Sequence, residues 1–232
     1  MSALEERVTA LREQIAAAAV AAGRDAASVR LLAVSKTFAA EHVIEAAGAG
    51  LHVFGENRVQ EAEEKIPAVG TPGGTRLEWH LVGRLQRNKA RRAAALFDVI
   101  HSLDRAELAR TLSNAAGELG RRPRVLLQID LDGEPQKGGA TPEQAPALAD
   151  EVAALPHLEL AGLMTIPRAH ADAESQRPAF ARLRTLAEEL KLRHPGLTEL
   201  SMGMSADFEV AIAEGATWVR LGTAVFGQRS AG

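Results

Sequence analysis

Cysteine and tyrosine are both absent from the 232-residue sequence, and aromatic residues make up only 3% of it. Without cysteine the chain can form no disulfide framework, thiolate nucleophile or cysteine metal site. The seven histidines show no metal-ligand spacing such as His-x-x-x-His, so we expect no metal site. The missing tyrosine removes one side chain that often serves enzymes as a general acid or base.

Long apolar runs are missing as well. The alanine-rich segment 15–22 is too short to span a bilayer, and the charged first residues lack the apolar stretch of a signal peptide. A net charge of −3 argues against a general nucleic-acid surface. The basic run 84–92 has few aromatic neighbours, so we expect it to be a solvated helix face rather than a nucleic-acid contact. These absences predict a cytoplasmic protein with neither a membrane nor a nucleic-acid partner.

The order of the remaining segments predicts the fold. Apolar residues at helical spacing run from Leu4 to Ala18, and Gly23 stands where a helix would end. Strand-like and helix-like segments then alternate. Strands are expected at 31–35, 52–55, 78–82, 99–102, 124–130, 159–165, 199–202 and 218–221. Helices are expected at 40–47, 57–66, 86–96, 105–119, 143–154, 174–193 and 206–214. This pattern predicts an α/β fold, a single (β/α)8 TIM barrel over residues 1–232 with an extra N-terminal helix. That helix is expected to cover the side left open after the last strand.

Candidate site residues stand at or near the carboxyl ends of the expected strands. In a barrel these ends converge on one mouth, so their clustering is more informative than any single member. In chain order the candidates are Lys36, Asn57, His80, Met164, Ser201 and the segment 220–223. His80 lies among apolar neighbours, and we expect a structural or cofactor-packing role rather than a catalytic one.

Lys36 is the candidate whose position most needs a chemical explanation. It closes the apolar run 31–35, which is typical of a strand buried on both faces. A buried ammonium is costly unless it is paired, neutralised or chemically modified. A strand-end lysine whose head reaches water is the ordinary alternative. A lysine that faces a phosphate site would instead suggest pyridoxal phosphate.

The ends of the seventh and eighth expected strands have the composition of an anion site. Barrel phosphate sites commonly use the loops after these two strands, where backbone N–H groups face the anion. Ser205 is a candidate cap of the following helix, Gly222 would allow close approach, and Thr223 and Ser201 offer hydroxyl groups. Ordinary capping and a turn are the alternative for either segment alone.

Arg220 supports a cofactor more specifically. It stands in an otherwise apolar segment, so an inward-facing guanidinium would need an acceptor. A pyridine nitrogen would serve, and because arginine holds its proton, that nitrogen would stay unprotonated and the ring would be a weaker electron sink. An ion pair with Glu56 or Asp207 is the alternative. The glycine-rich loop 132–139, which contains Lys137, follows the fifth strand and could be a lid or a plain flexible loop.

Together these segments resemble the pyridoxal 5′-phosphate homeostasis protein family, barrel relatives of alanine racemase. The matching stretches are 33–37, 54–61, 79–89, 162–166, 200–207 and 219–227. The resemblance implies an alanine racemase N-terminal domain-like barrel with pyridoxal 5′-phosphate bound to Lys36 as an internal aldimine. It also implies a phosphate near Ser201, Gly222 and Thr223, with Arg220 at the ring nitrogen.

Two functions then compete. A pyridoxal phosphate-dependent amino-acid racemase would need a base on each face of the substrate carbon, Lys36 and typically a tyrosine. The chain has no tyrosine, so another group such as His80 would have to act. A carrier would instead hold pyridoxal phosphate reversibly on Lys36 and release or deliver it to apo-enzymes. We expect the carrier function, in a monomer, and leave open whether Lys137 takes part in transfer.

Overall fold

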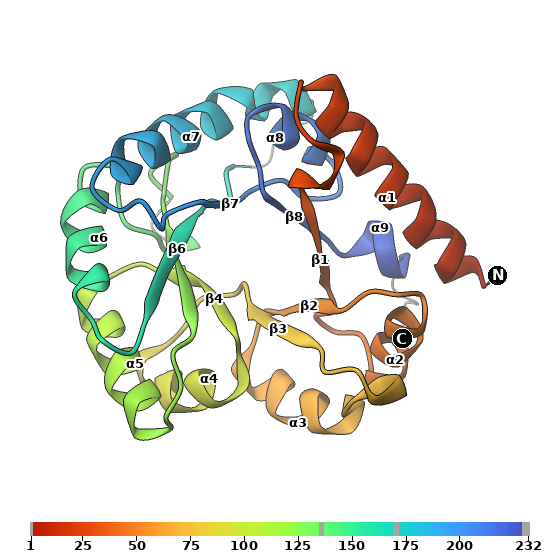
Figure 1. Ribbon diagram of the computed structural model, residues 1–232, viewed down its shortest axis with the longest axis horizontal. Helices are drawn as coiled ribbons and strands as arrows, with labels where there is room; N and C mark the ends of the chain where they lie inside the picture. Colours follow the sequence, from red (N-terminus) through yellow and green to blue (C-terminus); the bar gives the residue numbers. More distant parts are fainter. Residues whose placement is uncertain (1, 135–136, 169–171, 229–232) are drawn as a thin grey trace.

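The computed structural model describes residues 2–134, 137–168 and 172–228. Within these ranges, strands β1 to β8 pair in parallel in sequence order, and β8 pairs with β1 to close the barrel (Figure 1). The strands are β1 (Arg30–Val34), β2 (Val53–Glu56), β3 (Glu78–Leu81), β4 (Val99–Leu103), β5 (Arg124–Gln128), β6 (Glu159–Met164), β7 (Glu199–Ser201) and β8 (Trp218–Leu221). The helices are α1 (Ala3–Ala21), α2 (Ala40–Gly48), α3 (Val59–Val69), α4 (Ala90–Leu96), α5 (Ala106–Glu118), α6 (Ala145–Ala153), α7 (Arg177–Lys191), α8 (Phe208–Ala213) and α9 (Thr223–Phe226). The predicted barrel is confirmed.

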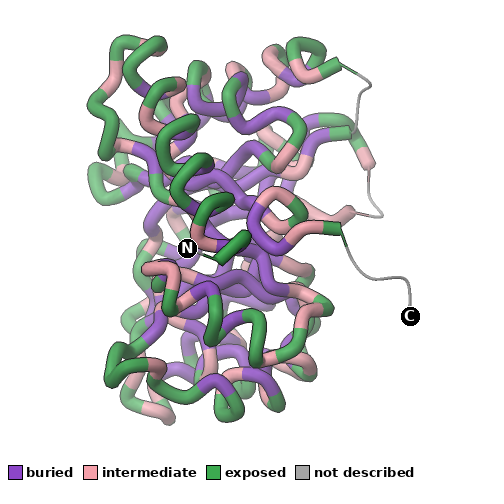
Figure 2. The backbone as a smooth tube through the Cα atoms, turned by 90° about the vertical axis from the view of Figure 1, so that its right-hand side faces the viewer, coloured by how far each residue is buried: buried purple, intermediate pink, exposed green. Residues whose placement is uncertain are grey.

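Apolar side chains pack on both sides of the strands. One large cluster joins the strands to the surrounding helices, and smaller clusters, one of them formed by Leu32, Val34, Val82 and Trp218, are separate from it. Because successive strand residues point to opposite faces, the second kind of cluster fills the barrel interior. Buried backbone accordingly runs through the middle of the molecule, and exposed residues lie mostly on the outer helices (Figure 2). Burial on both faces explains why the strands are such continuous apolar runs.

Helix α1 covers the side of the barrel beside α8 and α9, as predicted (Figure 1). Its start is a capping box, in which the Ser2 hydroxyl accepts from the Glu5 N–H at 3.2 Å and the Glu5 carboxylate accepts from the Ser2 N–H at 2.7 Å. Arg7 donates to the carbonyl of Val225 in α9 at 2.9 Å. The single turn of α9 is too short to cover this side alone.

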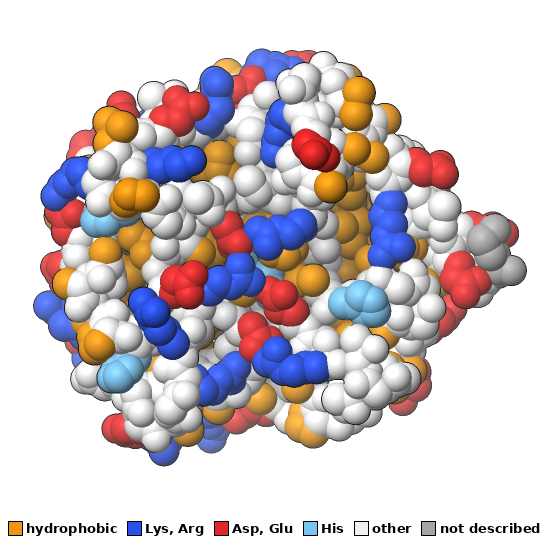
Figure 3. Space-filling view, viewed as in Figure 1, with side chains coloured by type: hydrophobic (Ala, Val, Ile, Leu, Met, Phe, Trp, Pro, Cys, Tyr) orange, Lys and Arg blue, Asp and Glu red, His pale blue; other side chains and the backbone are white. Residues whose placement is uncertain are grey.

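The amino end of the barrel is closed by charged side chains that are the first residues of alternate strands. Arg30 and Arg124 each bond the Glu199 carboxylate at 2.6 Å, and Arg124 also bonds Glu78 at 2.5 Å. On the face drawn in Figure 3, basic and acidic side chains meet over the centre of the barrel. Within the described ranges, every helix is too short or too polar to cross a lipid bilayer.

The first strand is buried as expected, with Leu32, Ala33 and Val34 all buried, but it ends one residue earlier than predicted. Lys36 lies two residues beyond its end and is half-buried, in agreement with the strand-end alternative. The buried lysine of this region is Lys65, on α3, which is 7% exposed. Lys36 therefore needs no buried counter-ion, whereas the buried ammonium of Lys65 has two, Glu56 and Glu61.

Candidate functional site

A cavity of about 530 Å³ opens where the strands end, on the side of the barrel opposite the charged layer. Six of the predicted site residues line this cavity: Lys36, Asn57, Ser205, Arg220, Gly222 and Thr223. Apolar side chains complete much of the wall: Val34, Val82, Ile166 and Met204. The cavity thus combines apolar surface with a few polar groups, which is the usual composition of a small-molecule site.

Three predicted site residues lie beneath this cavity rather than along its wall. His80, Met164 and Ser201 are all 0% exposed and are not among its lining residues. Gln128, which the sequence analysis did not single out, does line the cavity. It ends β5, but the expected strand ran on to residue 130 and so placed Gln128 inside it rather than among the strand-end candidates.

The backbone on both sides of Lys36 is held by α3. The carbonyl of Ser35 accepts from the Lys65 ammonium at 2.8 Å, and the N–H of Thr37 donates to the Glu61 carboxylate at 2.5 Å. Thr37 has φ of +67°, a left-handed conformation that is strained for a β-branched residue. Within the described residues, the Lys36 ammonium itself has no hydrogen bond or ion pair. Its backbone is therefore fixed while its amine is free to react.

The buried cluster behind Lys36 is built around Lys65. This ammonium also bonds Glu56 at 2.7 Å and Glu61 at 2.8 Å, so each of its three N–H groups has an acceptor. Ser35 donates to the same Glu56 oxygen at 2.7 Å, and the second Glu56 oxygen is buried without a partner. Burial raises the pKa of Glu56, against the lowering effect of its bonds to Lys65 and Ser35.

Arg220 reaches the cavity floor from β8. It donates to the Ser201 carbonyl at 2.6 Å, to the Ser201 hydroxyl at 2.8 Å and to the Thr165 carbonyl at 2.8 Å. A guanidinium carries five N–H groups, so two have no acceptor among the described residues and are available to a ligand. The alternative ion pair with Glu56 or Asp207 does not form, because Glu56 pairs with Lys65 and the Asp207 carboxylate accepts from the N–H of Met204. Burial lowers the pKa of Arg220 to about 10, against the effect of the nearby Asp207, and the side chain stays charged at neutral pH.

Below Arg220, a chain of buried hydrogen bonds runs along the barrel interior. The Ser201 hydroxyl lies 2.9 Å from Nδ1 of His101, whose Nε2 lies 2.8 Å from Nδ1 of His80. Nε2 of His80 in turn lies 2.8 Å from the carboxylate of Glu78, in the charged layer. The chain therefore joins the cavity floor to the opposite end of the barrel.

The two ends of this chain fix its polarity. Arg220 can only donate and an ionised Glu78 can only accept, so each member between them must accept on the Arg220 side and donate on the Glu78 side. We accordingly assign the proton of both imidazoles to Nε2. Burial lowers the pKa of His80 and lowers that of His101 well below its ordinary value, so both rings are neutral. The bond from His80 lowers the pKa of Glu78.

The loops after β7 and β8 form the other side of the cavity. A Cβ added at Gly222 would lie 3.3 Å from the Val34 carbonyl, so this position leaves little room for a side chain. The Thr223 hydroxyl bonds that of Ser205 at 3.3 Å. No hydrogen bond is described for the backbone N–H groups of Ser205 and Ala206, which both line the cavity. Free N–H groups beside two hydroxyls suit a phosphate.

The predicted cap of α8 is wrong. The helix begins at Phe208 with Asp207 as its N-cap, and the Asp207 carboxylate accepts from the N–H of Met204 at 2.6 Å. Ser205 consequently lies in the turn before the helix and is free to contact a ligand. Burial raises the pKa of Asp207.

Lys137 lies at the rim of the same cavity. Its ammonium donates to the carbonyl of Pro167 at 3.1 Å and pairs with Glu134, while Gln128 donates to the Lys137 carbonyl at 2.9 Å. These contacts tie the loop after β5 to the loop after β6. The glycine-rich loop was expected to be a lid or a flexible loop, and its residues 135–136 lie outside the described residues.

The fold and this site define a class of protein: a parallel barrel with a free lysine after β1, an arginine in β8 and a glycine–threonine turn at the mouth. The family model described as alanine racemase, N-terminal domain, matches residues 7–230 of the chain. A pyridoxal phosphate homeostasis protein of Pseudomonas aeruginosa is 49% identical over 233 residues, which cover 100% of this chain and 98% of that protein. The protein of the same name from Escherichia coli K12 is 41% identical over 229 residues, 99% of this chain and 98% of the relative. The chain belongs to the pyridoxal phosphate homeostasis protein family.

Solved structures agree with this assignment. PipY of Synechococcus elongatus, in a structure described as having pyridoxal phosphate bound, superposes with a TM-score of 0.86 at 43% identity, covering 97% of this chain and 100% of PipY. An alanine racemase of Clostridium difficile superposes with a TM-score of 0.68 at 18% identity, covering 88% of this chain and 52% of the racemase. That second likeness concerns the fold alone.

Proposed function

We propose that this chain is a pyridoxal 5′-phosphate carrier, which holds the cofactor as a Schiff base on Lys36 and releases or delivers it to apo-enzymes. We further propose that it works as a cytoplasmic, single-domain monomer. The observation that carries the proposal is the convergence of a free lysine, an arginine with spare donors and a phosphate-sized set of N–H and hydroxyl groups on one cavity of about 530 Å³. The pyridoxal phosphate bound by PipY supports the choice of ligand.

The residues present fit the cofactor. When bound, the cofactor supplies a reactive aldehyde carbon on an aromatic ring. The Lys36 amine, once deprotonated, forms the C=N bond and one water leaves, and hydrolysis returns both partners. Arg220 donates to the ring nitrogen and keeps it unprotonated, since its own pKa of about 10 leaves it charged at neutral pH. Ser205, Gly222 and Thr223 receive the phosphate.

The same geometry favours reversible binding of the cofactor over catalysis with it. A charged arginine at the ring nitrogen weakens the electron sink on which proton abstraction depends. The racemase alternative needs a second base, and the chain contains no tyrosine. His80 does not replace it, because both of its ring nitrogens are bonded and its side chain is 0% exposed. Lys36 is therefore a reversible tether with no partner base.

The proposal is tested first by absorbance. Purified protein with pyridoxal phosphate should show a Schiff-base absorbance band that the free cofactor lacks, and Lys36→Ala should lose this band. Lys137→Ala serves as the matched control, because its ammonium lies at the rim of the same cavity but already has partners. An unchanged band in Lys36→Ala would refute the tether.

Carrier and enzyme are then separated with single-enantiomer alanine. The protein loaded with cofactor should change the optical rotation no faster than the same concentration of free pyridoxal phosphate. It should also restore activity to a pyridoxal phosphate-dependent apo-enzyme. Turnover well above the free-cofactor background would overturn the carrier in favour of a racemase-like enzyme.

A further inference from the structure

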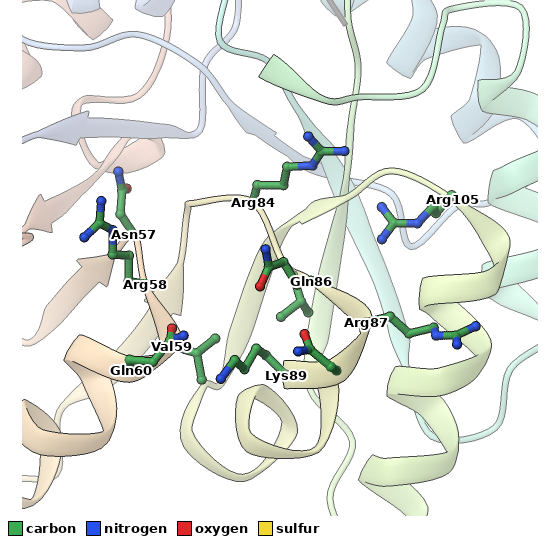
Figure 4. Close-up of a pocket in the computed structure, with 11 residues that line it drawn as sticks. Asn57, Arg58, Val59, Gln60, Arg84, Gln86, Arg87, Lys89 and Arg105 are labelled. Carbon is green, nitrogen blue, oxygen red and sulfur yellow. The ribbon is translucent and has the colours of Figure 1, made fainter. Parts of the chain in front are cut away.

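A second and larger hollow lies beside the proposed cofactor cavity. It has a volume of about 1030 Å³ and is lined by the turn after β2, the start of α3 and the loops after β3 and β4 (Figure 4). Asn57 and Arg84 line both the hollow and the cofactor cavity, so the two adjoin. We call this hollow the basic groove. Nothing in the proposed carrier function uses it.

The basic groove is charged with one sign. Its lining includes five cations (Arg58, Arg84, Arg87, Lys89 and Arg105), four side-chain amides and no carboxylate. The chain as a whole carries a net charge of −3, so this concentration of positive charge is local. Like charges gathered in one hollow repel each other, and a bound anion would relieve that repulsion.

Three of the five cations have no described counter-ion. Arg87 pairs with Glu107, and Arg105 bonds Asp104 at 2.5 Å. Arg58, Arg84 and Lys89 have no hydrogen bond or ion pair among the described residues. In Figure 4, Lys89 extends toward Val59 and Gln60 at the start of α3, so it spans the groove rather than pointing away from it.

The arginines of the basic run that lie outside the groove are each paired with a carboxylate. Arg91 and Arg92 stand one helical turn further along the same run, outside the groove lining. Each has a carboxylate partner, Glu118 for Arg91 and Glu63 for Arg92, the latter at 3.2 Å. The expectation of a solvated helix face is therefore met by this part of the run, whereas Arg84 and Lys89 face a hollow without acidic groups.

We propose that the basic groove binds a small polyanion with at least two phosphate groups, at a site separate from the cofactor cavity. Guanidinium groups bind phosphate oxygens in pairs, and the neighbouring amides can bond the rest of such a ligand. The volume lies at the upper end of the range for small-molecule sites. A nucleic acid fits less well, because the lining has no aromatic side chain on which a base could stack. This inference does not depend on whether Lys36 holds a cofactor.

Calorimetric titration with inorganic pyrophosphate tests the proposal, with inorganic phosphate as the smaller anion. The parent protein should bind pyrophosphate at least about tenfold more tightly than phosphate, since charge-assisted hydrogen bonds add with each group reached. Arg58→Gln/Lys89→Gln should weaken pyrophosphate binding by roughly tenfold or more. The matched control is Arg91→Gln/Arg92→Gln, which removes the same charge from the same run and should stay within about twofold. Arg84 is left intact because it also lines the cofactor cavity.

Further titrations show where pyrophosphate binds. Saturating pyridoxal phosphate, and separately Lys36→Ala, should leave the pyrophosphate affinity unchanged. Equal weakening in the two double variants would show a diffuse electrostatic effect and overturn the proposal. Loss of pyrophosphate binding on addition of pyridoxal phosphate would place the probe in the cofactor cavity and overturn it as well. A single-stranded RNA oligonucleotide that binds more tightly than pyrophosphate would replace the small ligand with a macromolecule.

Discussion

Lys36 and Lys65 lie on either side of one short stretch of backbone, yet their surroundings differ completely. Lys65 donates to the carbonyl of Ser35, the residue before Lys36, and its other two N–H groups are taken by Glu56 and Glu61. The Lys36 ammonium lines an open cavity and has no partner among the described residues. One lysine serves as a buried counter-ion, and the other is available to chemistry.

The two lysines represent two regions of the barrel. Away from the mouth, buried polar groups bond each other, as in the Lys65 cluster beneath α3 and the chain from Arg220 to Glu78 in the barrel interior. At the mouth, Lys36, two N–H groups of Arg220 and the backbone N–H groups of Ser205 and Ala206 are left for a ligand. Buried groups that bond one another stabilise the fold and position the site, whereas the unpaired groups at the mouth are available to bind a ligand. Substitutions in one region therefore test whether the other depends on it.

Replacement of Lys65 should have the largest effect on stability. Lys65→Met leaves Glu56 buried without its counter-ion, so the free energy of unfolding should fall by about 3–5 kcal/mol in denaturant titrations. Lys65→Met/Glu56→Leu removes both charges and should recover most of that loss. Where Lys65→Met stays folded, the Schiff-base band should persist with weaker cofactor binding. Complete loss of the band in well-folded Lys65→Met would indicate that Lys65, and not Lys36, forms the Schiff base.

The buried histidines make a pH-dependent contribution. Burial lowers the pKa of His80 and His101, so below the ordinary value of 6.5 the unfolded chain binds protons that the folded protein does not. The free energy of unfolding should therefore fall as the pH drops from 6.5, by up to about 1.4 kcal/mol per pH unit for each histidine. Below about pH 4.5, the lowered pKa of Glu78 adds a loss of the same sign.

Urea titrations at pH 7, 6 and 5 measure this slope. His101→Asn should reduce it by up to half, because one of the two neutral rings is gone. The exposed His52, replaced by Asn, is the matched control. A parent protein whose stability is flat between pH 7 and pH 5 would mean that the two rings take up protons in the folded state as readily as in the unfolded chain, contrary to the assigned chain.

The smallest effect is expected at Thr37. Its φ of +67° costs an L-residue roughly 1–2 kcal/mol, which glycine avoids. Thr37→Gly should accordingly be about 1 kcal/mol more stable than Thr37→Ala, which keeps the strain and serves as its control. Both variants retain the N–H that bonds Glu61. Equal stability of the two would show that this backbone is not strained next to Lys36.

The sequence predicted the architecture better than it predicted the surroundings of individual side chains. Alternating apolar runs and helical segments predict a barrel, and the convergence of strand ends correctly brought Lys36, Arg220 and Gly222 to one cavity. Burial of Lys65 could not be predicted this way, because Glu61 and Lys65 form an i,i+4 pair that is typical of an exposed helix face. Glu56 joins them only through the packing of α3 on β2.

The polar chain in the interior was missed for a related reason. His101 stands in an apolar run, and one of its partners, Ser201, is a hundred residues away. Two neutral histidines become recognisable as a chain only when the closed barrel brings β3, β4 and β7 together. Ser205 illustrates a local error: α8 begins two residues later than the expected helix, so Asp207 rather than Ser205 stands at its N-cap position.

Borohydride reduction followed by peptide mapping tests the central claim most directly. The protein is saturated with pyridoxal phosphate, reduced, digested, and searched by mass for the lysine that carries the phosphopyridoxyl group. We expect the adduct on Lys36, with Lys65 and Lys137 unmodified. An adduct on Lys65 or Lys137 with Lys36 intact, or no adduct on any lysine, would contradict the account.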